Sequence, residues 1–235
     1  MRRGKDAIAD LFRDQLLTLS SSSFFSLDSV DGLYQNGICP RCRSPVGQRT
    51  DRPLSIRSIW PGDLSYSSDQ RMRARVWVVS DRFLELLTRR ERAQFDIRQV
   101  TMPLGTRKAF FEVLPRRFVP QAGVKNWSVS AGWYCGRCQA RAFSYDEQLG
   151  DILRTIVCRS SLLPAKPLLF VGDAGSFKIA VARDRWDEWR RVPVGKQIRG
   201  IPLAVIDSSL YAQVDLPEYE VVAERNRKRA RRARR

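Results

Sequence analysis

Apolar residues near the start of the chain recur at helical spacing and are separated by charged residues. This pattern predicts an amphipathic helix over roughly residues 5–18, and the serine run at 20–23 then acts as a loop or helix stop. The apolar positions that carry the pattern are Ile8, Leu11, Phe12, Leu16 and Leu19.

The most regular pattern in the chain lies at residues 76–100. It reads as a strand, a polar cap at Ser80 or Asp81, a helix, and a second strand near 95–101. The apolar face of the helix comprises Phe83, Leu84, Leu86 and Leu87. We therefore expect a strand-helix-strand unit.

A second pattern of this kind lies at residues 177–207. It predicts a strand, Asp184 as the helix cap, a short helix with Trp186 and Trp189 on one face, and a strand over "IPLAVI". The segments "VVSDRF" (78–83) and "VARDRW" (181–186) agree at valine, aspartate, arginine and an aromatic residue. The match is short, so an internal two-fold repeat and chance similarity both stay open.

Several shorter patterns complete the expected organisation. We expect strands at 73–80, 108–115 and 126–134, a helix at 146–162, a hairpin at 168–182, and turns at 36–37 and 60–64. The predicted fold class is α+β, with mostly antiparallel sheets, covering helices and two related halves tied together by four of the chain's cysteines. The expected parts are an N-terminal helix and serine-rich linker (1–30), a body (31–220) and a disordered basic tail (221–235).

Length and composition narrow the class of protein. With 235 residues and 43% hydrophobic content, the chain can build a core without disulfide staples. Its start does not read as a secretory signal, and its apolar runs are shorter than a membrane span. We therefore expect a cytoplasmic protein that does not enter a membrane, and in that compartment paired cysteines more often hold metal than form disulfides.

The chain is strongly basic. It has 42 lysines and arginines against 25 acidic residues, a formal net charge of +17. Such a balance favours an anionic partner, whether nucleic acid, a membrane surface or an acidic protein. Part of the excess lies in the tail, where the candidate contacts to such a partner are Arg225, Arg227, Lys228, Arg229, Arg231, Arg232, Arg234 and Arg235.

The chain contains no histidine. This excludes serine-histidine and cysteine-histidine hydrolase sites and metal sites of mixed cysteine and histidine ligands. It also lacks a Walker-type phosphate loop and a dinucleotide fingerprint. A pair of catalytic carboxylates stays open as an alternative, but we expect no enzyme activity.

Four of the five cysteines form two Cys-x-x-Cys pairs, Cys39 with Cys42 and Cys135 with Cys138. Each pair in a tight turn presents two sulfurs to one point, and two such knuckles complete a tetrahedral site. We expect one structural zinc ion per chain, which would organise the fold and take no part in catalysis. Cys158, the fifth cysteine, is expected to be a buried core thiol.

Three other interpretations of the cysteines remain. A thioredoxin-like redox pair needs only one Cys-x-x-Cys, at the start of a helix. Two structural disulfides would suit an exported protein. Four thiolates can also hold an iron–sulfur cluster, and the sequence does not separate this possibility from zinc.

The two knuckles, "WPGDLS" (60–65) and "VWVVSDRFLELL" (76–87) together resemble the myxobacterial double-CXXCG paralogous family. The resemblance covers roughly residues 30–220. It implies a cytoplasmic immunity protein that binds and neutralises a polymorphic toxin. The chain departs from the family at Arg43 and Gln139, where the family's knuckles end in glycine.

Two functions of different classes follow. The first is a non-enzymatic immunity protein that blocks a cognate toxin; the tryptophans are its candidate anchors, although tryptophan is more often a core residue. They are Trp60, Trp77, Trp127, Trp133, Trp186 and Trp189. The second is a zinc-containing nucleic-acid-binding protein that uses the basic tail and the residues beside the knuckles. Those residues are Arg41, Arg43, Arg137, Arg141, Trp133 and Tyr134.

Overall fold

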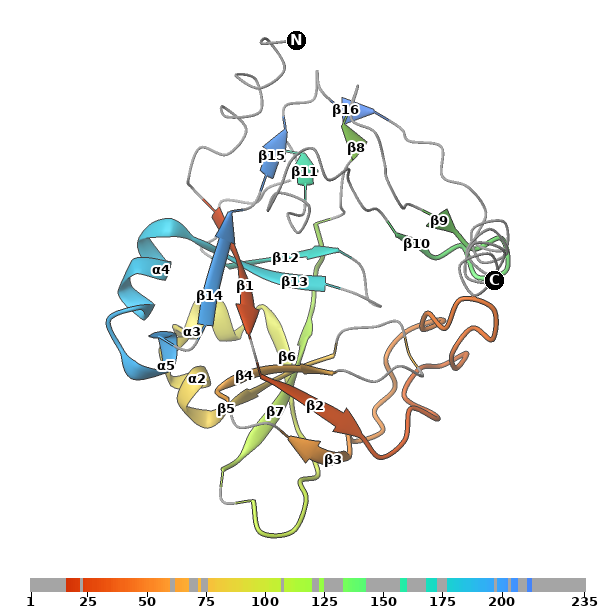
Figure 1. Ribbon diagram of the computed structural model, residues 1–235, viewed down its shortest axis with the longest axis horizontal. Helices are drawn as coiled ribbons and strands as arrows, with labels where there is room; N and C mark the ends of the chain where they lie inside the picture. The colour runs from red at the N-terminus through yellow and green to blue at the C-terminus, as the bar shows by residue number, and fades with distance from the viewer. Residues whose placement is uncertain are drawn as a thin grey trace, which may run out of the picture.

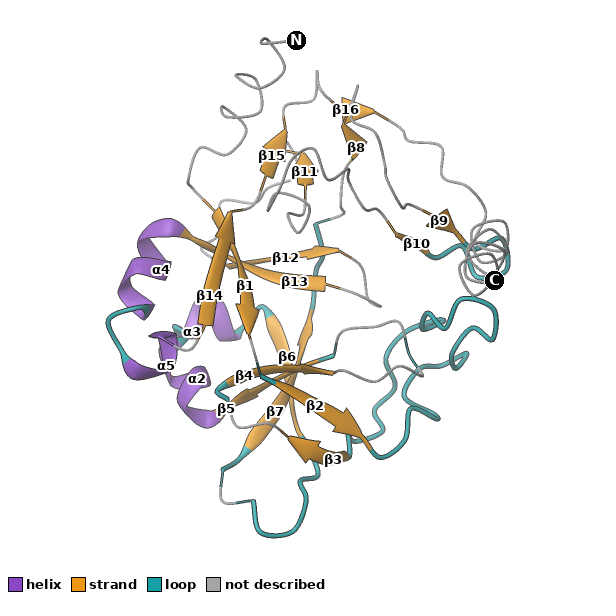
Figure 2. Cartoon of the chain, in the orientation of Figure 1, coloured by secondary structure: helices purple, strands orange, loops and turns teal. Residues whose placement is uncertain are grey.

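The chain folds into a mixed α/β structure with many strands and few helices (Figure 1, Figure 2). In this computed structural model the described residues are 16–21, 23–59, 62–67, 72, 76–106, 108–119, 123–124, 133–142, 157–159, 168–172, 177–196, 198–202, 204–206 and 211–212. The expected basic tail at 221–235 lies outside them, as does the part of the expected N-terminal helix that precedes residue 16.

The larger sheet has six strands in the order β3-β2-β4-β5-β7-β6. Its pairings are antiparallel except for β2 with β4. Beyond β6, Thr101 exchanges backbone hydrogen bonds with Leu54 and Ile56, so the two ends of the sheet meet. The strands are β2 (Phe24–Leu27), β3 (Ile56–Ile59), β4 (Leu64–Ser67), β5 (Trp77–Ser80), β6 (Phe95–Gln99) and β7 (Phe110–Pro115).

Strand β5 is buried on both faces because the larger sheet separates two cores. Trp77 and Val79 point into one core, while Val78 between them points into the other. The side chains of β7 alternate in the same way: Val113 lies in the first core and Phe110 lies in the second. The alternation follows from the two-residue period of a strand.

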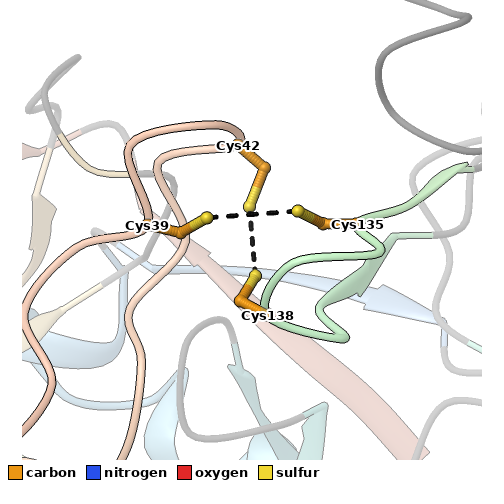
Figure 3. A group of neighbouring side chains, drawn as sticks. All are labelled: Cys39, Cys42, Cys135 and Cys138. Carbon is orange, nitrogen blue, oxygen red and sulfur yellow. Dashed lines mark hydrogen bonds between the residues drawn. The ribbon is translucent and has the colours of Figure 1, made fainter.

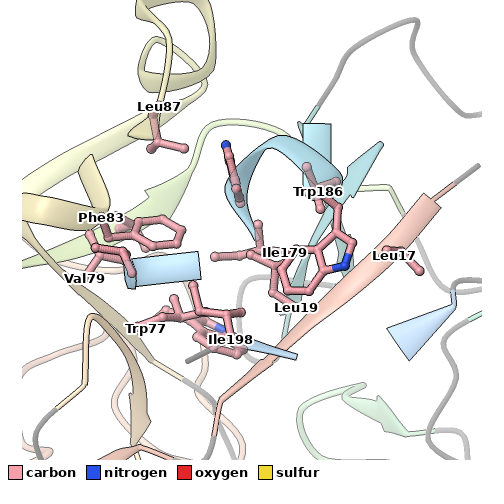
Figure 4. Close-up of a cluster of buried hydrophobic side chains, with 14 of the residues drawn as sticks. Leu17, Leu19, Trp77, Val79, Phe83, Leu87, Ile179, Trp186 and Ile198 are labelled. Atoms are coloured by element: carbon pink, nitrogen blue, oxygen red, sulfur yellow. The ribbon is translucent and has the colours of Figure 1, made fainter. Parts of the chain in front are cut away.

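The smaller sheet has four strands in the order β12-β13-β1-β14, all antiparallel. They are β12 (Leu168–Gly172), β13 (Phe177–Ala182), β1 (Leu16–Ser21) and β14 (Ile198–Pro202). Leu17, Leu19 and Ile179 from this sheet join Trp77 and Val79 in one cluster (Figure 4). The first core therefore lies between the two sheets.

Strand β1 corrects the prediction for the start of the chain. Residues 16–18, expected at the end of a helix, and Ser20 and Ser21, expected in a loop, all belong to this strand. Leu17 and Leu19 are buried at the two-residue spacing of a strand. β1 has a hydrogen-bonded neighbour on each side, and this tertiary pairing overrides the local helical pattern.

The first predicted strand-helix-strand unit is confirmed. Strand β5 leads into α2 (Asp81–Leu86), and the Ser80 side chain accepts the backbone N–H of Phe83 as the predicted cap. The helix then breaks, because Thr88 starts a new capping box with Glu91 at the head of α3 (Arg89–Arg92). The chain continues into β6.

The second unit is confirmed except for its cap and its last strand, because the segment predicted as one strand over 201–206 divides between β14 (Ile198–Pro202) and β15 (Ala204–Ile206), which pair in different sheets. Strand β13 leads into α4 (Arg183–Trp189), then α5 (Pro193–Lys196) and β14. Ala182, not Asp184, is the N-cap and makes no side-chain capping bond, because the helix starts two residues earlier than predicted and Asp184 falls within its first turn. Trp186 and Trp189 are buried as predicted.

The helices of the two units lie on the same side of the molecule (Figure 1). The rings of Phe83 and Trp189 meet edge to face at 5.6 Å. The Arg185 guanidinium donates from Nε to Glu91 Oε1 at 3.0 Å and from Nη2 to the Leu86 carbonyl at 2.6 Å. An apolar contact and a buried carboxylate thus join the two helical regions.

Gly62 lies where the chain crosses from one sheet to the other. Strands β1 and β2 belong to different sheets, and Ser23 in the short link between them lies against Gly62 of the "WPGDLS" segment. A Cβ on Gly62 would lie 2.0 Å from Ser23 Oγ. The glycine therefore makes room for the chain to cross from one sheet to the other.

Three two-stranded pairings complete the described structure: β8 (Gly123–Val124) with β16 (Tyr211–Ala212), β9 (Trp133–Tyr134) with β10 (Arg141–Ala142), and β11 (Val157–Arg159) with β15 (Ala204–Ile206). Residues 157–159, expected within a helix over 146–162, form a strand because they pair in parallel with β15. The expected hairpin at 168–182 is confirmed as β12 and β13.

Candidate metal centre

The four cysteines of the two knuckles meet at one point although the pairs are far apart in sequence. Their Sγ atoms all lie within 4.8 Å of one another (Figure 3). Cys39 Sγ is 4.0 Å from Cys135 Sγ, and Cys42 Sγ is 3.4 Å from Cys138 Sγ. These distances are too long for S–S bonds and bracket the separation of about 3.8 Å expected for sulfurs placed tetrahedrally around zinc.

The first knuckle is the tip of a two-stranded ribbon. Tyr34 pairs with Arg49 and Ile38 pairs with Pro45, so the chain folds back on itself around Cys39 and Cys42. The backbone N–H of Cys39 donates to the Ser44 carbonyl at 2.8 Å, and the N–H of Arg43 donates to the Cys39 carbonyl at 2.8 Å. These bonds fix the tight turn that directs both sulfurs to one side.

The second knuckle repeats this arrangement 96 residues later. It is the tip of the β9–β10 hairpin, in which Tyr134 pairs with Arg141. The N–H of Cys135 donates to the Ala140 carbonyl at 2.9 Å, and the N–H of Gln139 donates to the Cys135 carbonyl at 2.7 Å. Each bond and each pairing next to the turn therefore has its counterpart in the first knuckle.

Both knuckles end on a residue in the left-handed backbone conformation. The φ angle is 62° at Arg43 and 61° at Gln139, and these are the only non-glycine residues in the described part of the chain with positive φ. Glycine is favoured in this conformation because it has no Cβ. Arg43 and Gln139, at the positions where the double-CXXCG pattern has glycine, thus have the backbone conformation that glycine favours.

The environment of the thiols differs from one cysteine to the next. Burial raises the pKa of Cys39, but the backbone N–H groups of Cys42 and Arg41 outweigh burial and lower it to about 7. Burial raises the pKa of Cys42, and burial together with the neighbouring thiols raises the pKa of Cys138 to about 12. The raised pKa values of Cys42 and Cys138 disfavour thiolates at these two positions, and a bound cation would supply the positive charge that stabilises them.

A buried ion pair anchors the base of the first ribbon. The Arg49 guanidinium donates from Nε and Nη2 to the two carboxylate oxygens of Glu112 at 2.8 and 2.9 Å, and it also donates to the carbonyls of Leu33 and Thr50. Glu112 belongs to β7 and is fully buried. Burial raises the pKa of Glu112, and the positive charge of Arg49 opposes that shift. The ribbon that carries Cys39 and Cys42 is thereby fixed to the larger sheet.

Sequence reasoning missed this ion pair. Arg49 is one of many arginines, so nothing in the sequence marks it as the partner of Glu112. A signal was available in the predicted strand at 108–115, because Glu112 is the one carboxylate within the apolar segment "FFEVLP". A charged residue buried among apolar neighbours needs a partner.

The remaining predicted site residues fall into three groups. Arg43 and Arg137 are exposed beside the cysteines, while Arg41 and Tyr134 are partly buried. Trp77, Trp186 and Trp189 are buried in the core, so they do not serve as exposed anchors. The side chains outside the described part of the chain are those of Trp60, Trp127, Trp133, Arg141, Cys158 and the eight basic residues of the tail.

The fold and this site define a class: a mixed α/β protein, built mostly of strands, with a buried four-cysteine cluster that could hold a metal ion. Within the described residues, this is the only group of three or more histidine, cysteine or acidic side chains placed to bind one. No described helix is both long and apolar enough to cross a membrane. Comparison with protein-family models, curated proteins and solved structures finds no match.

Proposed function

We propose that Cys39, Cys42, Cys135 and Cys138 bind one zinc ion whose role is structural. The observation that carries this proposal is the convergence of four sulfurs from two geometrically equivalent knuckles. Four protein thiolates fill the tetrahedral coordination of zinc and leave no position for water or substrate. The metal would therefore hold the two knuckles together and would not activate a substrate.

Elemental analysis of the purified protein tests the metal. We expect about one zinc per chain in the native protein, and we expect Cys135→Ser to lower both the zinc content and the melting temperature. Cys158→Ser is the matched control and should keep its zinc, because Cys158 lies in β11 outside the cluster. Full zinc content and unchanged melting in Cys135→Ser would disprove the assignment of ligands.

We further propose that the chain is a non-enzymatic cytoplasmic immunity protein that neutralises a cognate toxin by binding it. Support comes from the segments that carry the resemblance to the double-CXXCG family. "WPGDLS" and "VWVVSDRFLELL" contact each other, because Ser80 donates its hydroxyl to the Asp63 carboxylate at 2.7 Å and its N–H to the Asp63 carbonyl at 3.0 Å. Arg43 and Gln139, at the positions where the family's knuckles end in glycine, have the left-handed conformation that glycine favours.

Charge indicates the kind of toxin surface that would be recognised. With a net charge of +17, this protein would associate fastest with a partner that presents an acidic face. Co-expression with the product of a neighbouring toxin gene tests the proposal. We expect restored growth and a stoichiometric complex with the cognate toxin; continued killing by every neighbouring toxin candidate would refute the immunity role.

Nucleic-acid binding is the second candidate, and the charge around the cysteines favours it. Segments 32–50 and 133–142, which carry the knuckles, contain no carboxylate, and Arg43 and Arg137 are exposed there. A salt titration with random DNA and RNA separates the candidates. Binding that disappears when 225–235 is deleted reflects the tail alone, whereas sequence-dependent binding that survives the deletion would favour the nucleic-acid role over immunity.

A further inference from the structure

The two strand-helix units have the same layout. In the larger sheet, β5 and β6 flank β7 and are joined through α2 and α3; in the smaller sheet, β13 and β14 flank β1 and are joined through α4 and α5. Each unit is also preceded by a strand that pairs with its first strand, β4 with β5 and β12 with β13. The strand order β4-β5-β7-β6 therefore matches β12-β13-β1-β14.

The register of the two hairpins agrees as well as the strand order, whereas the register of the middle strands differs by one residue. Adding 103 to the residue number takes Val78 to Val181. The same offset superposes β6 (Phe95–Gln99) on β14 (Ile198–Pro202). Under this offset the pair Ser65–Val78 in the first hairpin becomes Leu168–Val181, which is the observed pair in the second. A chance similarity between two short helical segments would not also give the two hairpins the same pairing register.

The inserted middle strands come from the opposite half of the chain. β1 precedes the first knuckle but lies in the sheet of the second unit, between β13 and β14. β7 precedes the second knuckle but lies in the sheet of the first unit, between β5 and β6. Each middle strand pairs with three residues of one neighbour and five of the other.

We infer that the chain is an internal duplication of one unit, in which each unit inserts its first strand into the sheet of the other. Each unit comprises a strand, a cysteine knuckle, a hairpin, two helices and a last strand. This exchange means that the two units are held together twice, once by the exchanged strands in the body and once by the four cysteines at the knuckle end.

The two connections differ in what they depend on. β1 and β7 are held by backbone hydrogen bonds and by apolar side chains of the shared core, among them Leu17, Leu19 and Val113. The cysteines form a separate small cluster of their own. If zinc binds there as proposed above, its removal opens the knuckle end while the exchanged strands keep the body assembled. The structure of the knuckle end thus depends on bound metal, whereas the structure of the body does not.

Cutting the chain between the units tests this inference. The turn at 103–106 lies between β6 and β7, Leu104 is fully exposed, and a Cβ at Gly105 would meet nothing within 4 Å. A recognition sequence for a site-specific protease is inserted between Leu104 and Gly105, and the folded protein is cut there. We expect both fragments to elute as one species in size-exclusion chromatography, with metal and after chelation. Separation of the fragments upon chelation alone would overturn the inference.

Hydrogen exchange on the uncut protein provides the second measurement. After chelation we expect faster exchange in the knuckle segments 34–49 and 133–142 and unchanged protection in β1 and β7. The variant with Cys42→Ser and Cys138→Ser should reproduce this pattern without chelator. Loss of protection in β1 and β7 on metal removal would contradict the two-connection arrangement. Absence of zinc from the untreated protein would instead refute the metal assignment, and the fragments would still test the strand exchange.

Discussion

Two residues, Arg43 and Gln139, show that a knuckle can end on a left-handed residue other than glycine. Both hold positive φ, which costs an L-residue roughly 1 kcal/mol relative to glycine. The backbone bonds from their N–H groups to the carbonyls of Cys39 and Cys135 fix that conformation. The knuckle geometry therefore depends on the turn rather than on the identity of its last residue.

Gln139→Gly should consequently stabilise the metal-loaded protein. We expect the free energy of unfolding to rise by about 0.5 kcal/mol, because relief of the left-handed strain exceeds the added entropy of the unfolded chain. Arg137→Gly is the matched control in the same turn: Arg137 does not have positive φ, so glycine there should be neutral or destabilising. Equal effects of the two changes in thermal unfolding would argue against strain at Gln139.

Single residues also show what the sequence could reveal about the site. The convergence of the four cysteines was predictable from their spacing, and Ser80 was one of the two predicted caps because local chemistry defines a cap. The partnership of Arg49 with Glu112 was not, because it joins residues 63 positions apart and depends on how a ribbon lies against a sheet. The cap assigned to Asp184 failed because helix starts shift by a residue or two without changing the pattern.

At the scale of elements, the crossing from β1 to β2 depends on close packing against the "WPGDLS" segment. Gly62→Ala places a methyl group 2.0 Å from Ser23 Oγ and 2.5 Å from Ser23 Cβ, so the chain must shift. We expect a loss of roughly 1–3 kcal/mol in the free energy of unfolding by denaturant. Adding Ser23→Gly removes both clashing atoms and should recover most of the loss; no recovery in the double variant would show that the clash is not the cause.

The contact between the two helical regions gives a prediction for pH. Burial raises the pKa of Glu91, but the Arg185 guanidinium and the Thr88 N–H outweigh burial and lower it. A lowered pKa in the folded state stabilises the protein above the ordinary carboxyl pKa, and the contribution is lost as pH falls through the lowered value. Glu91→Gln should therefore cost about 2 kcal/mol at neutral pH, and the difference should shrink below about pH 4.

Glu188→Gln is the control for this prediction, because Glu188 pairs with the same arginine from an exposed position. We expect it to change the free energy of unfolding by less than about 1 kcal/mol. Urea unfolding of both variants between acid and neutral pH provides the comparison. A pH-independent cost of Glu91→Gln would show that the carboxylate charge does not contribute.

At the scale of the whole molecule, the sequence predicted the class of fold and both strand-helix units, because their patterns are local. It did not predict that β1 is a strand, since leucines at 16, 17 and 19 fit either period and its neighbours β13 and β14 lie more than 150 residues away. The strand exchange was hidden for the same reason: pairing partners distant in sequence leave no local signal. Equivalent knuckles, by contrast, could be expected from the cysteine spacing alone.

We have proposed that one zinc ion is bound by all four cysteines in a closed tetrahedral site. X-ray absorption at the zinc edge, on the purified full chain, measures the number and distance of the metal's neighbours directly. We expect four sulfur neighbours at about 2.3 Å and no oxygen or nitrogen neighbour. A first shell with fewer than four sulfurs, or a protein that carries iron with bridging sulfide in place of zinc, would contradict it.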